Sequence, residues 1–523
     1  GCVCVSHVAS VFLCRSSYVS DGVVNGVGSL QIEFEQDERS VETIQERRRL
    51  QKAARESKVA PSSFAGMLGG ESWLKTQRKE ELQCGRPPEM RPDVPVCLLC
   101  EIFAHFQEDV ESIVLTREDC EFAGRLSSSM AGIFVSENER RDAFGDIFWS
   151  YMSSVDSSAL AATFGGIGIR RQGMADVMTD GTVLASPSGE FVLNVEVKRE
   201  KGEGKDSYMQ NVKYYSVFWS NFCDGRRCQE DRCPSFLLEL CGNTLSVSGA
   251  VWGKHACASP LTSLLYLLGF SLPQDEPALT HLARVCAALR KGVRALIDYY
   301  RTLPPLSASA HEVIKREARS CYPYVDHYFS KEQQKEIYFE YQKSLVDKKL
   351  LFLVKTEEGN RMVVKFCRRY NREAHRLCAQ RGYAPRLASV EQLAGGWLMV
   401  VMEYIEGILL SECGCDGGWD ASEVLGQVED CVTMLHQNGY VHGDLRENNI
   451  LVVSSEGSGT PSKAVLVDFD WAGRSGEDRY PLFMNHSEVT WPDGAEDGSV
   501  LEEAHDWFWF EKLRIDCGMN STT

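Results

Sequence analysis

The stretch "GYVHGDLRENNILV", residues 439–452, places a carboxylate and an amide five residues apart between two apolar runs. Asp444 can orient and deprotonate an acceptor hydroxyl, and the side-chain oxygen of Asn449 can hold a metal ion. A purely structural loop needs turn formers, which Gly443 and Asn448 supply, but it does not need this pairing. The spacing therefore predicts the transfer of a phosphoryl group.

Phosphoryl transfer depends on positioning and charge neutralisation more than on covalent chemistry. The minimum set is a lysine against the phosphates, two oxygen ligands for Mg²⁺ and one orienting carboxylate. Lys365 and Asp468 complete this set around Asp444 and Asn449. Mg²⁺ suits so sparse a site because it also binds the phosphates of its nucleotide. The predicted cofactors are ATP and Mg²⁺.

Residues 335–510 resemble a protein-kinase-like fold, because "VVKFC", "VMEYIEG", "HGDLRENN" and "LVDFDWAG" follow one another in kinase order. The resemblance implies a phosphate-binding lysine with a helix partner, two hinge residues beside adenine, a base, an arginine on the transferred phosphate and two metal ligands. These are Lys365, Glu373, Glu403, Tyr404, Asp444, Arg446, Asn449 and Asp468.

Several departures from the kinase pattern predict a compact, atypical member. No G-x-G-x-x-G precedes Lys365, Gly443 replaces the arginine of His-Arg-Asp, and Asp470 replaces the glycine after the metal ligand. Too few residues follow Asp470 for a full helical lobe. The expected activity is phosphorylation of Ser/Thr or of the chain itself. The alternatives are a pseudokinase that only senses nucleotide and a scaffold without activity.

A second constellation lies in the middle of the chain. Asp176 ends one expected strand, and Glu196 and Lys198 end the next, "EFVLNVEVK". Residues i and i+2 of a strand share one face, so Glu196 and Lys198 project together. Two carboxylates for Mg²⁺ and a lysine that activates water are the requirements of phosphodiester hydrolysis. The alternative is a surface ion pair.

This middle region resembles the PD-(D/E)xK restriction-endonuclease-like fold. The resemblance implies an additional helix carboxylate, Glu139, and a glutamine on the following helix, Gln210. Five cations predict a local basic face that would bind DNA; they are Lys198, Arg199, Lys201, Lys205 and Lys213. A nuclease-like module followed by a short kinase-like module resembles the C-terminal part of Crinkler-type effectors. That resemblance implies an intracellular protein, cytoplasmic or nuclear, that is delivered to a host cell if it is an effector.

The elements that position these residues suggest an α/β and α+β multidomain chain. We expect a restriction-endonuclease-like α/β core and a two-lobed protein-kinase-like fold with a shortened C-lobe. Strands alternate with helices in the middle of the chain, and three successive strands begin near residue 336. The predicted divisions are an N-terminal region with a charged helix and a linker, the nuclease-like domain, a linker and the kinase-like domain; they span 1–95, 96–305, 306–334 and 335–523.

Composition limits the other possibilities. The net charge of −18 argues against a protein that coats nucleic acid over its whole surface. Twenty cysteines in 523 residues are below the density of a disulfide scaffold, so we expect reduced thiols. A zinc knuckle over residues 223–241 is a weaker alternative. No apolar run reaches the length of a membrane span, and no membrane partner is expected.

Overall fold

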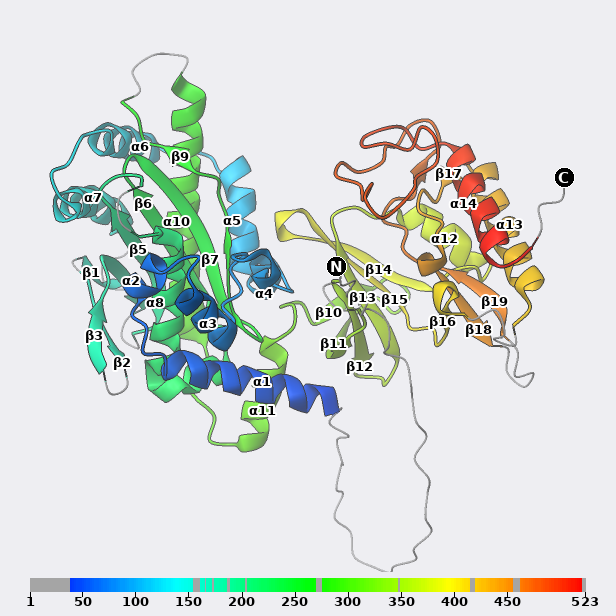
Figure 1. Ribbon diagram of the computed structural model, residues 1–523, viewed down its shortest axis with the longest axis horizontal. Coiled ribbons are helices and arrows are strands. Elements are labelled where there is room, and N and C mark those ends of the chain that lie inside the picture. Colours follow the sequence, from blue (N-terminus) through cyan, green and yellow to red (C-terminus); the bar gives the residue numbers. More distant parts are fainter. Residues whose placement is uncertain are drawn as a thin grey trace, which may run out of the picture. The chain divides into compact units, whose positions relative to one another are not determined.

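The computed structural model describes residues 38–153, 160–164, 166–171, 174–185, 189–202, 205–269, 275–346, 349–413, 419–454 and 461–519. These residues form a mixed α/β protein with several separate sheets (Figure 1). The two largest sheets have seven and six strands, and each carries one of the constellations predicted from the sequence.

The seven-stranded sheet has the order β1-β4-β5-β6-β7-β8, and β9 pairs with β7. Its strands are β1 (Leu160–Phe164), β4 (Gly181–Ala185), β5 (Phe191–Lys198), β6 (Ser235–Cys241), β7 (Thr244–Trp252), β8 (Ala256–Pro260) and β9 (Leu265–Tyr266). Strands β5 and β6 are parallel and the other pairs are antiparallel. Every residue of β5 is buried, and the strand lies between β4 and β6 inside the sheet. A separate two-stranded sheet pairs β2 (Gly168–Arg171) with β3 (Met174–Met178).

Helices cover this sheet and share its hydrophobic core. They are α4 (Val96–Leu99), α5 (Glu101–Ser112), α6 (Arg117–Met130), α7 (Glu137–Met152), α8 (Ser207–Asn221), α9 (Arg226–Glu230) and α10 (Glu276–Thr302). The 3-10 turn η2 (Phe222–Gly225) joins α8 to α9. Phe103 of α5 packs edge-on against Phe236 of β6, and Tyr215 of α8 stacks near Trp252 of β7. The core therefore joins elements from the whole length of the middle region.

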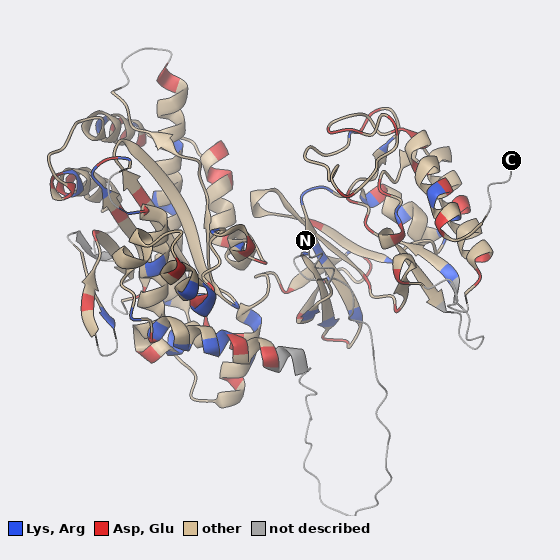
Figure 2. Cartoon of the chain, viewed as in Figure 1, with Lys and Arg blue, Asp and Glu red and all other residues tan. Residues whose placement is uncertain are grey.

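The N-terminal helices belong to the same core. Helices α1 (Glu38–Arg55), α2 (Pro61–Gly66) and α3 (Glu71–Glu80), with the 3-10 turn η1 (Pro88–Met90), precede α4. Phe64 and Trp73 are buried in the cluster that contains the sheet residues. Lys213 of α8 is fully buried and forms an ion pair with Glu80, which is also buried. Lys213 therefore ties α8 to α3 and is no part of an exposed basic face. Both acidic and basic residues occur along α1 (Figure 2), where Glu46 comes directly before the run Arg47–Arg49.

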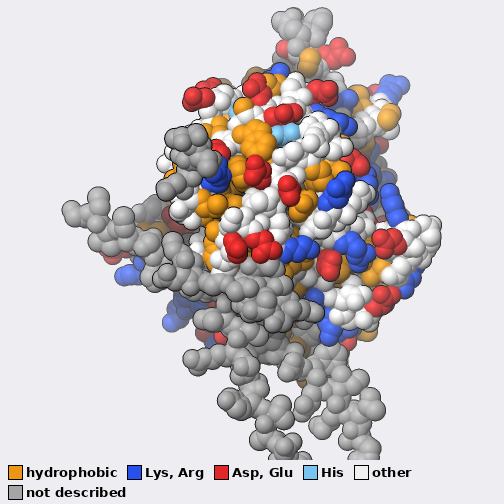
Figure 3. Space-filling view, turned by 90° about the vertical axis from the view of Figure 1, so that its right-hand side faces the viewer, with side chains coloured by type: hydrophobic (Ala, Val, Ile, Leu, Met, Phe, Trp, Pro, Cys, Tyr) orange, Lys and Arg blue, Asp and Glu red, His pale blue; other side chains and the backbone are white. Residues whose placement is uncertain are grey.

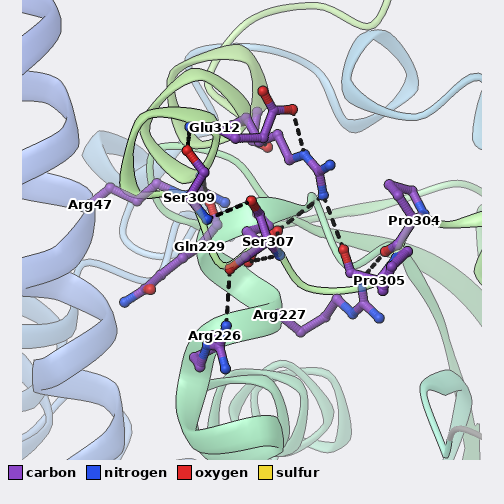
Figure 4. Close-up of polar contacts among 12 residues, drawn as sticks. Arg47, Arg226, Arg227, Gln229, Pro304, Pro305, Ser307, Ser309 and Glu312 are labelled. Atoms are coloured by element: carbon purple, nitrogen blue, oxygen red, sulfur yellow. Dashed lines mark hydrogen bonds and ion pairs between the residues drawn. The ribbon is translucent and has the colours of Figure 1, made fainter.

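The segment after α10 is held by arginines and one glutamate. Arg226 and Arg227 of α9 donate to the carbonyl oxygens of Ser307 and Pro304, and the N–H of Ser307 donates to Glu230 (Figure 4). Helix α11 (Ala310–Ser320) follows. The predicted linker, 306–334, thus contains helix α11 and also β10 (His327–Ser330), a strand of the six-stranded sheet.

The six-stranded sheet is antiparallel, with the order β10-β11-β12-β13-β15-β14. Its strands are β10 (His327–Ser330), β11 (Lys335–Ser344), β12 (Leu351–Thr356), β13 (Arg361–Cys367), β14 (Leu387–Leu393) and β15 (Trp397–Glu403). Valine, phenylalanine and methionine fill one face of β13 and β15. Lys365 lies on strand β13 of this sheet.

The remaining elements carry the predicted catalytic loop, residues 442–449, and the predicted metal segment, residues 466–473. The helices are α12 (Arg372–Gln380), α13 (Ala421–Gln437) and α14 (Glu503–Asp516), with 3-10 turns η4 (Ala394–Gly396), η5 (Leu410–Glu412) and η6 (Glu447–Asn449). One small sheet has the order β16 (Ile408–Leu409), β18 (Ile450–Ser454), β19 (Pro461–Leu466), and another pairs β17 (Tyr440–Val441) with β20 (Gly473–Arg474). Within the described residues, no helix is long and apolar enough to cross a membrane.

Candidate functional site

The residues of the predicted catalytic loop lie close together. Asp444 is almost buried, and the Asn449 amide nitrogen donates to its carboxylate Oδ2 at 2.9 Å and to its carbonyl oxygen at 2.8 Å. The N–H of Val467, beside Asp468, donates to the Asn449 carbonyl oxygen at 2.9 Å. The loop and the metal segment are therefore joined by a backbone hydrogen bond.

Arg446 forms a two-point ion pair with Asp444. Its Nε lies 2.5 Å from Oδ1 and its Nη2 lies 2.9 Å from Oδ2. The hydrogen bond to Asp444 raises the pKa of Arg446 against the effect of burial. The guanidinium carbon lies 5.4 Å from the centre of the Trp491 ring, which stacks on Trp471. An acceptor hydroxyl must share Asp444 with this arginine.

Lys365 is held between two carboxylates. Its Nζ lies 2.7 Å from Asp468 Oδ1 and 2.7 Å from Asp470 Oδ1. Burial alone would lower the pKa of Lys365, but the two carboxylates raise it above the ordinary value. Burial acts to raise the pKa of Asp468, yet Lys365 holds it below the ordinary value. The lysine is thus a fixed positive charge at the place where nucleotide phosphates would bind.

Glu373, implied as the helix partner of Lys365, does not fill that role in this structure. Its side chain is 57% exposed in the first turn of α12, and its carboxylate pairs with Arg376 at 3.2 Å. Asp470, which occupies the place of a glycine in the kinase pattern, is the second partner of Lys365. The sequence marks Asp470 as unusual, but only the fold reveals its partner.

Asp506 is a site residue that the sequence reasoning missed. It is fully buried on α14, and its carboxylate accepts hydrogen bonds from the backbone N–H groups of His442 and Gly443 at 2.8 and 2.9 Å. Gly443 has a φ of +78°, and a Cβ there would lie 2.9 Å from the Trp471 carbonyl oxygen. The position therefore excludes an arginine sterically. The sequence feature that could have identified Asp506 is an acidic residue within the aromatic run of α14.

Phe469, between the two aspartates, anchors the metal segment in the core. Its ring stacks on His375 with centroids 4.7 Å apart. The His375 ring accepts from the Tyr370 hydroxyl at Nδ1 and donates to the Pro385 carbonyl oxygen from Nε2. Burial lowers the pKa of His375 to about 4, so the ring is neutral near pH 7. Asp468 adopts a φ of +67°, a conformation rare outside glycine.

The predicted hinge residues, Glu403 and Tyr404, already make backbone hydrogen bonds within the protein. The N–H of Glu403 donates to the Arg386 carbonyl oxygen, and the N–H of Tyr404 donates to that of Arg361. The Arg361 guanidinium also covers the Tyr404 ring at 4.1 Å. The N–H groups of Glu403 and Tyr404 are therefore already occupied in this structure.

The residues present fit a Mg²⁺ ion bound with ATP. Asp468 offers a partly buried carboxylate, and Asn449 donates from its amide nitrogen, which leaves its amide oxygen as a ligand. Among the described residues, no three histidine, cysteine or acidic side chains form a complete metal cage, and the cysteines of residues 223–241 form no zinc site. An ion that takes its other ligands from phosphates and water agrees with such a sparse site.

Two solved structures are similar to part of the chain. One is the Cydia pomonella granulovirus kinase PK-1, with 19% identity over 35% of this chain and 69% of its own, at a TM-score of 0.28. The other is vaccinia related kinase 3, with 15% identity over 36% of this chain and 66% of its own, at a TM-score of 0.27. No family model and no curated protein matches. Both structures are protein kinases by name, but TM-scores this low carry no weight, and neither bears on a nuclease or a Crinkler-type effector.

The middle constellation gathers around the end of β5. Lys198 and Glu196 form an ion pair at 2.5 Å, and Glu137 of α7 lies 3.6 Å from the lysine. Asp180 precedes β4, and its Oδ2 accepts from the N–H of Val197 at 2.8 Å. Burial raises the pKa of Glu196, and the nearby Asp180 adds to this effect. Three carboxylates thus surround one lysine.

The structure does not bring Asp176 or Glu139 to this group. Asp176 is exposed on β3, in the separate two-stranded sheet, and its carboxylate lies against Gly168 of β2. Glu139 accepts from the Val135 N–H instead. Asp180 and Glu137 occupy the places expected for these residues. Asp180 lies four residues after Asp176, and Glu137 lies two residues before Glu139. Shifts of this size depend on strand pairing and on the rotation of the helix about its axis.

Gln210 and Glu196 each present one buried oxygen that has no hydrogen-bond partner among the described residues. These are Oε1 of Gln210 and Oε2 of Glu196. Such atoms are costly unless a ligand satisfies them. Gln210 lies on α8, the helix that follows β5, and its role at the site stays a prediction.

Replacing Asp470 is expected to impair nucleotide binding more than replacing Glu373. In Asp470→Asn, Lys365 loses a charged partner, a bond worth about 1.5–3 kcal/mol, and the Kd for Mg·ATP should rise about tenfold. In Glu373→Gln the Kd for Mg·ATP should stay within about twofold, because the Glu373 side chain pairs with Arg376. Isothermal titration calorimetry measures both values. A larger effect of Glu373→Gln would show that the helix partner operates in the nucleotide-bound state.

His375 is expected to make stability pH-dependent. Its folded pKa of about 4 lies below the ordinary value of 6.5, so between these values the unfolded chain binds a proton that the folded chain does not. The free energy of unfolding should therefore fall as the pH drops from 6.5 towards 4. Urea titrations should show the advantage of wild type over His375→Gln shrinking by about 2 kcal/mol between pH 7 and 4.5. His311→Gln, at an exposed position on α11, is the control. A pH-independent difference would contradict this assignment.

Proposed function

We propose that the C-terminal module is an ATP-dependent phosphotransferase, an atypical protein kinase that acts on Ser/Thr or on the chain itself. The observation that supports it best is the convergence of four side chains on one site. These are Lys365, Asp444, Asn449 and Asp468. Surface loops do not assemble this set, whereas phosphoryl transfer requires all of it.

Each residue has one task in this proposal. Lys365 neutralises phosphate charge, and Asp470 keeps its ammonium in place when Asp468 serves the metal. Asp444 accepts the proton of the acceptor hydroxyl. Arg446 must leave Asp444 for this step, and the transferred phosphate offers it an alternative anion. Bound Mg²⁺ would supply charge neutralisation across the phosphates.

We propose that the catalytic loop is held in place without phosphorylation of the chain. Gly443 leaves no arginine to pair with a phosphorylated segment, while Asp506 already holds the loop backbone. Packing of Trp471, Trp491 and Tyr480 holds the following segment. On the face where α13 and α14 lie, acidic, basic and hydrophobic side chains are interspersed (Figure 3), which suits a protein acceptor better than a polyanion.

Loss of the base should separate binding from transfer. Asp444→Asn is expected to reduce autophosphorylation, measured with radiolabelled ATP, by about 10²–10⁴-fold, the usual range for general-base loss. Its Kd for Mg·ATP should change by less than about threefold. Asp468→Ala should lose Mg²⁺-dependent ATP binding, and Asp430→Asn, at an exposed position on α13, is the control. Binding without transfer by wild type under all conditions would leave the pseudokinase alternative, and failure to bind ATP would reject both.

A second candidate function is Mg²⁺-dependent DNA hydrolysis by the middle module, with the C-terminal module as a nucleotide sensor. The two unpartnered buried oxygens of Glu196 and Gln210 favour it. Glu196 and Asp180 would hold the metal, which lowers the pKa of a bound water. Lys198 would then orient that water towards a phosphate. The Crinkler-type resemblance and an effector role in the cytoplasm or nucleus remain part of this second proposal.

Matched aspartate variants test the nuclease proposal. Asp180→Ala and Glu196→Gln should abolish Mg²⁺-dependent cleavage of an end-labelled DNA and weaken Mn²⁺ binding measured by calorimetry. Asp176→Ala should retain both, because that side chain lies on the other sheet. Lys198→Met should lose cleavage but keep DNA affinity. Equal loss in Asp176→Ala and Asp180→Ala would restore Asp176 as a metal ligand. Unchanged cleavage in Glu196→Gln would reject the site.

A further inference from the structure

Strand β9 exposes apolar side chains on one face. Along residues 264–268 burial alternates: Leu265 and Leu267 are 7% and 0% exposed, whereas Leu264, Tyr266 and Leu268 are 60%, 56% and 43% exposed. A strand with one solvated face normally carries polar residues there. Three outward apolar residues in a row indicate a surface that binds something.

The strand register connects this surface to the cluster at the end of β5. Lys198 lies opposite Cys241, Cys241 lies opposite Thr244, and Thr244 lies opposite Tyr266. Side chains of directly opposite residues point to the same face of a sheet. Tyr266 therefore shares a face and a row with Lys198, three strand spacings or roughly 14 Å away. A chain-like molecule bound at Lys198 and following this row would reach Tyr266.

A cation lies beside the aromatic ring. Lys201 is exposed in the turn after β5, and its Nζ lies 4.3 Å from the centre of the Tyr266 ring. An aromatic face with a neighbouring cation is the arrangement by which proteins bind single-stranded nucleic acids, because the base stacks and the phosphate meets the charge.

The surrounding framework is rigid. Arg140 is buried, and its guanidinium donates to the Gly242 carbonyl oxygen and to Glu200, each at 2.6 Å. It thereby fixes the turns after β5 and β6 on either side of this row. A platform held in advance does not have to be ordered when a ligand binds.

We propose that Tyr266 and Lys201 form a stacking platform for single-stranded nucleic acid, one or two nucleotides from a phosphate held at Glu196 and Lys198. The proposal deepens the second candidate function and rests on it. A single strand exposes base faces that a duplex keeps stacked. Glu137 and Glu200 nearby, and the net charge of −18, weaken purely electrostatic binding of a duplex backbone. The platform therefore selects for single strands.

The test uses the full chain and a fluorescein-labelled 20-nucleotide oligothymidylate, with anisotropy measured in EDTA so that no cleavage occurs. Tyr266→Ala should weaken binding by about 5- to 150-fold, the range for loss of one base–aromatic stack. Tyr266→Phe, which keeps the ring, should bind within about twofold of wild type. Tyr338→Ala, at an exposed tyrosine of β11, is the control. For a duplex of equal length, Tyr266→Ala should change affinity by less than about threefold.

The outcomes separate the platform from the nuclease. Equal affinity of wild type and Tyr266→Ala for the single strand would overturn the platform, even if Glu196→Gln abolishes cleavage. A Tyr266→Phe variant as weak as Tyr266→Ala would also overturn it, because the hydroxyl rather than the ring would then bind. Loss of single-strand affinity in Tyr266→Ala, in a protein that cleaves nothing, would support the platform and reject hydrolysis. A protein that binds no oligothymidylate would overturn the platform.

Discussion

The contact between the Lys365 ammonium and the carboxylates of Asp468 and Asp470 is the constraint on which the C-terminal site depends. One cation fixes two anions that are two residues apart, and the residue between them, Phe469, must then point into the core. That geometry imposes the positive φ of Asp468. Without the lysine, two partly buried carboxylates would face each other unpaired. The metal segment therefore takes its shape from electrostatics, and packing against His375 fixes it.

The same arrangement shows that Lys365 is positioned without the helix glutamate. In the pattern that the sequence resembles, a helix glutamate pairs with the lysine, so the position of that helix matters. Here Asp470 takes the role and Glu373 remains in solvent. Asp506 similarly holds the catalytic-loop backbone from α14, near the end of the chain. Asp470, which is partly buried, and Asp506, which is buried, thus replace contacts that would otherwise require mobile or additional elements.

Local sequence patterns predicted the elements well and long-range partners poorly. The strands at Phe191–Lys198 and Arg361–Cys367 coincide with the predicted runs, because alternation and apolar runs are properties of neighbouring residues. The structure also brings together Asp444 and Asn449, the acidic and amide pair that the sequence marks, with the Asn449 amide nitrogen 2.9 Å from Asp444 Oδ2. The sequence pattern indicates Asp176, whereas the structure places Asp180 beside β5, because strand pairing is set by partners far along the chain. Lys213 was expected at the surface, and only the packing of α3 on α8 shows that it is buried.

The ion pair of Lys213 and Glu80 has a consequence for how much of the chain the middle module needs. A polypeptide shortened to begin at the Pro-rich turn near residue 95 would keep the lysine and discard its glutamate. The ammonium would then remain inside the fold without a counter-charge, a loss of about 3–5 kcal/mol by itself. The apolar surface beneath Phe64 and Trp73 would also become wet. Helices α1 to α3 therefore behave as an inseparable part of the sheet, and any gene fusion or shuffling that transfers this module must carry them along.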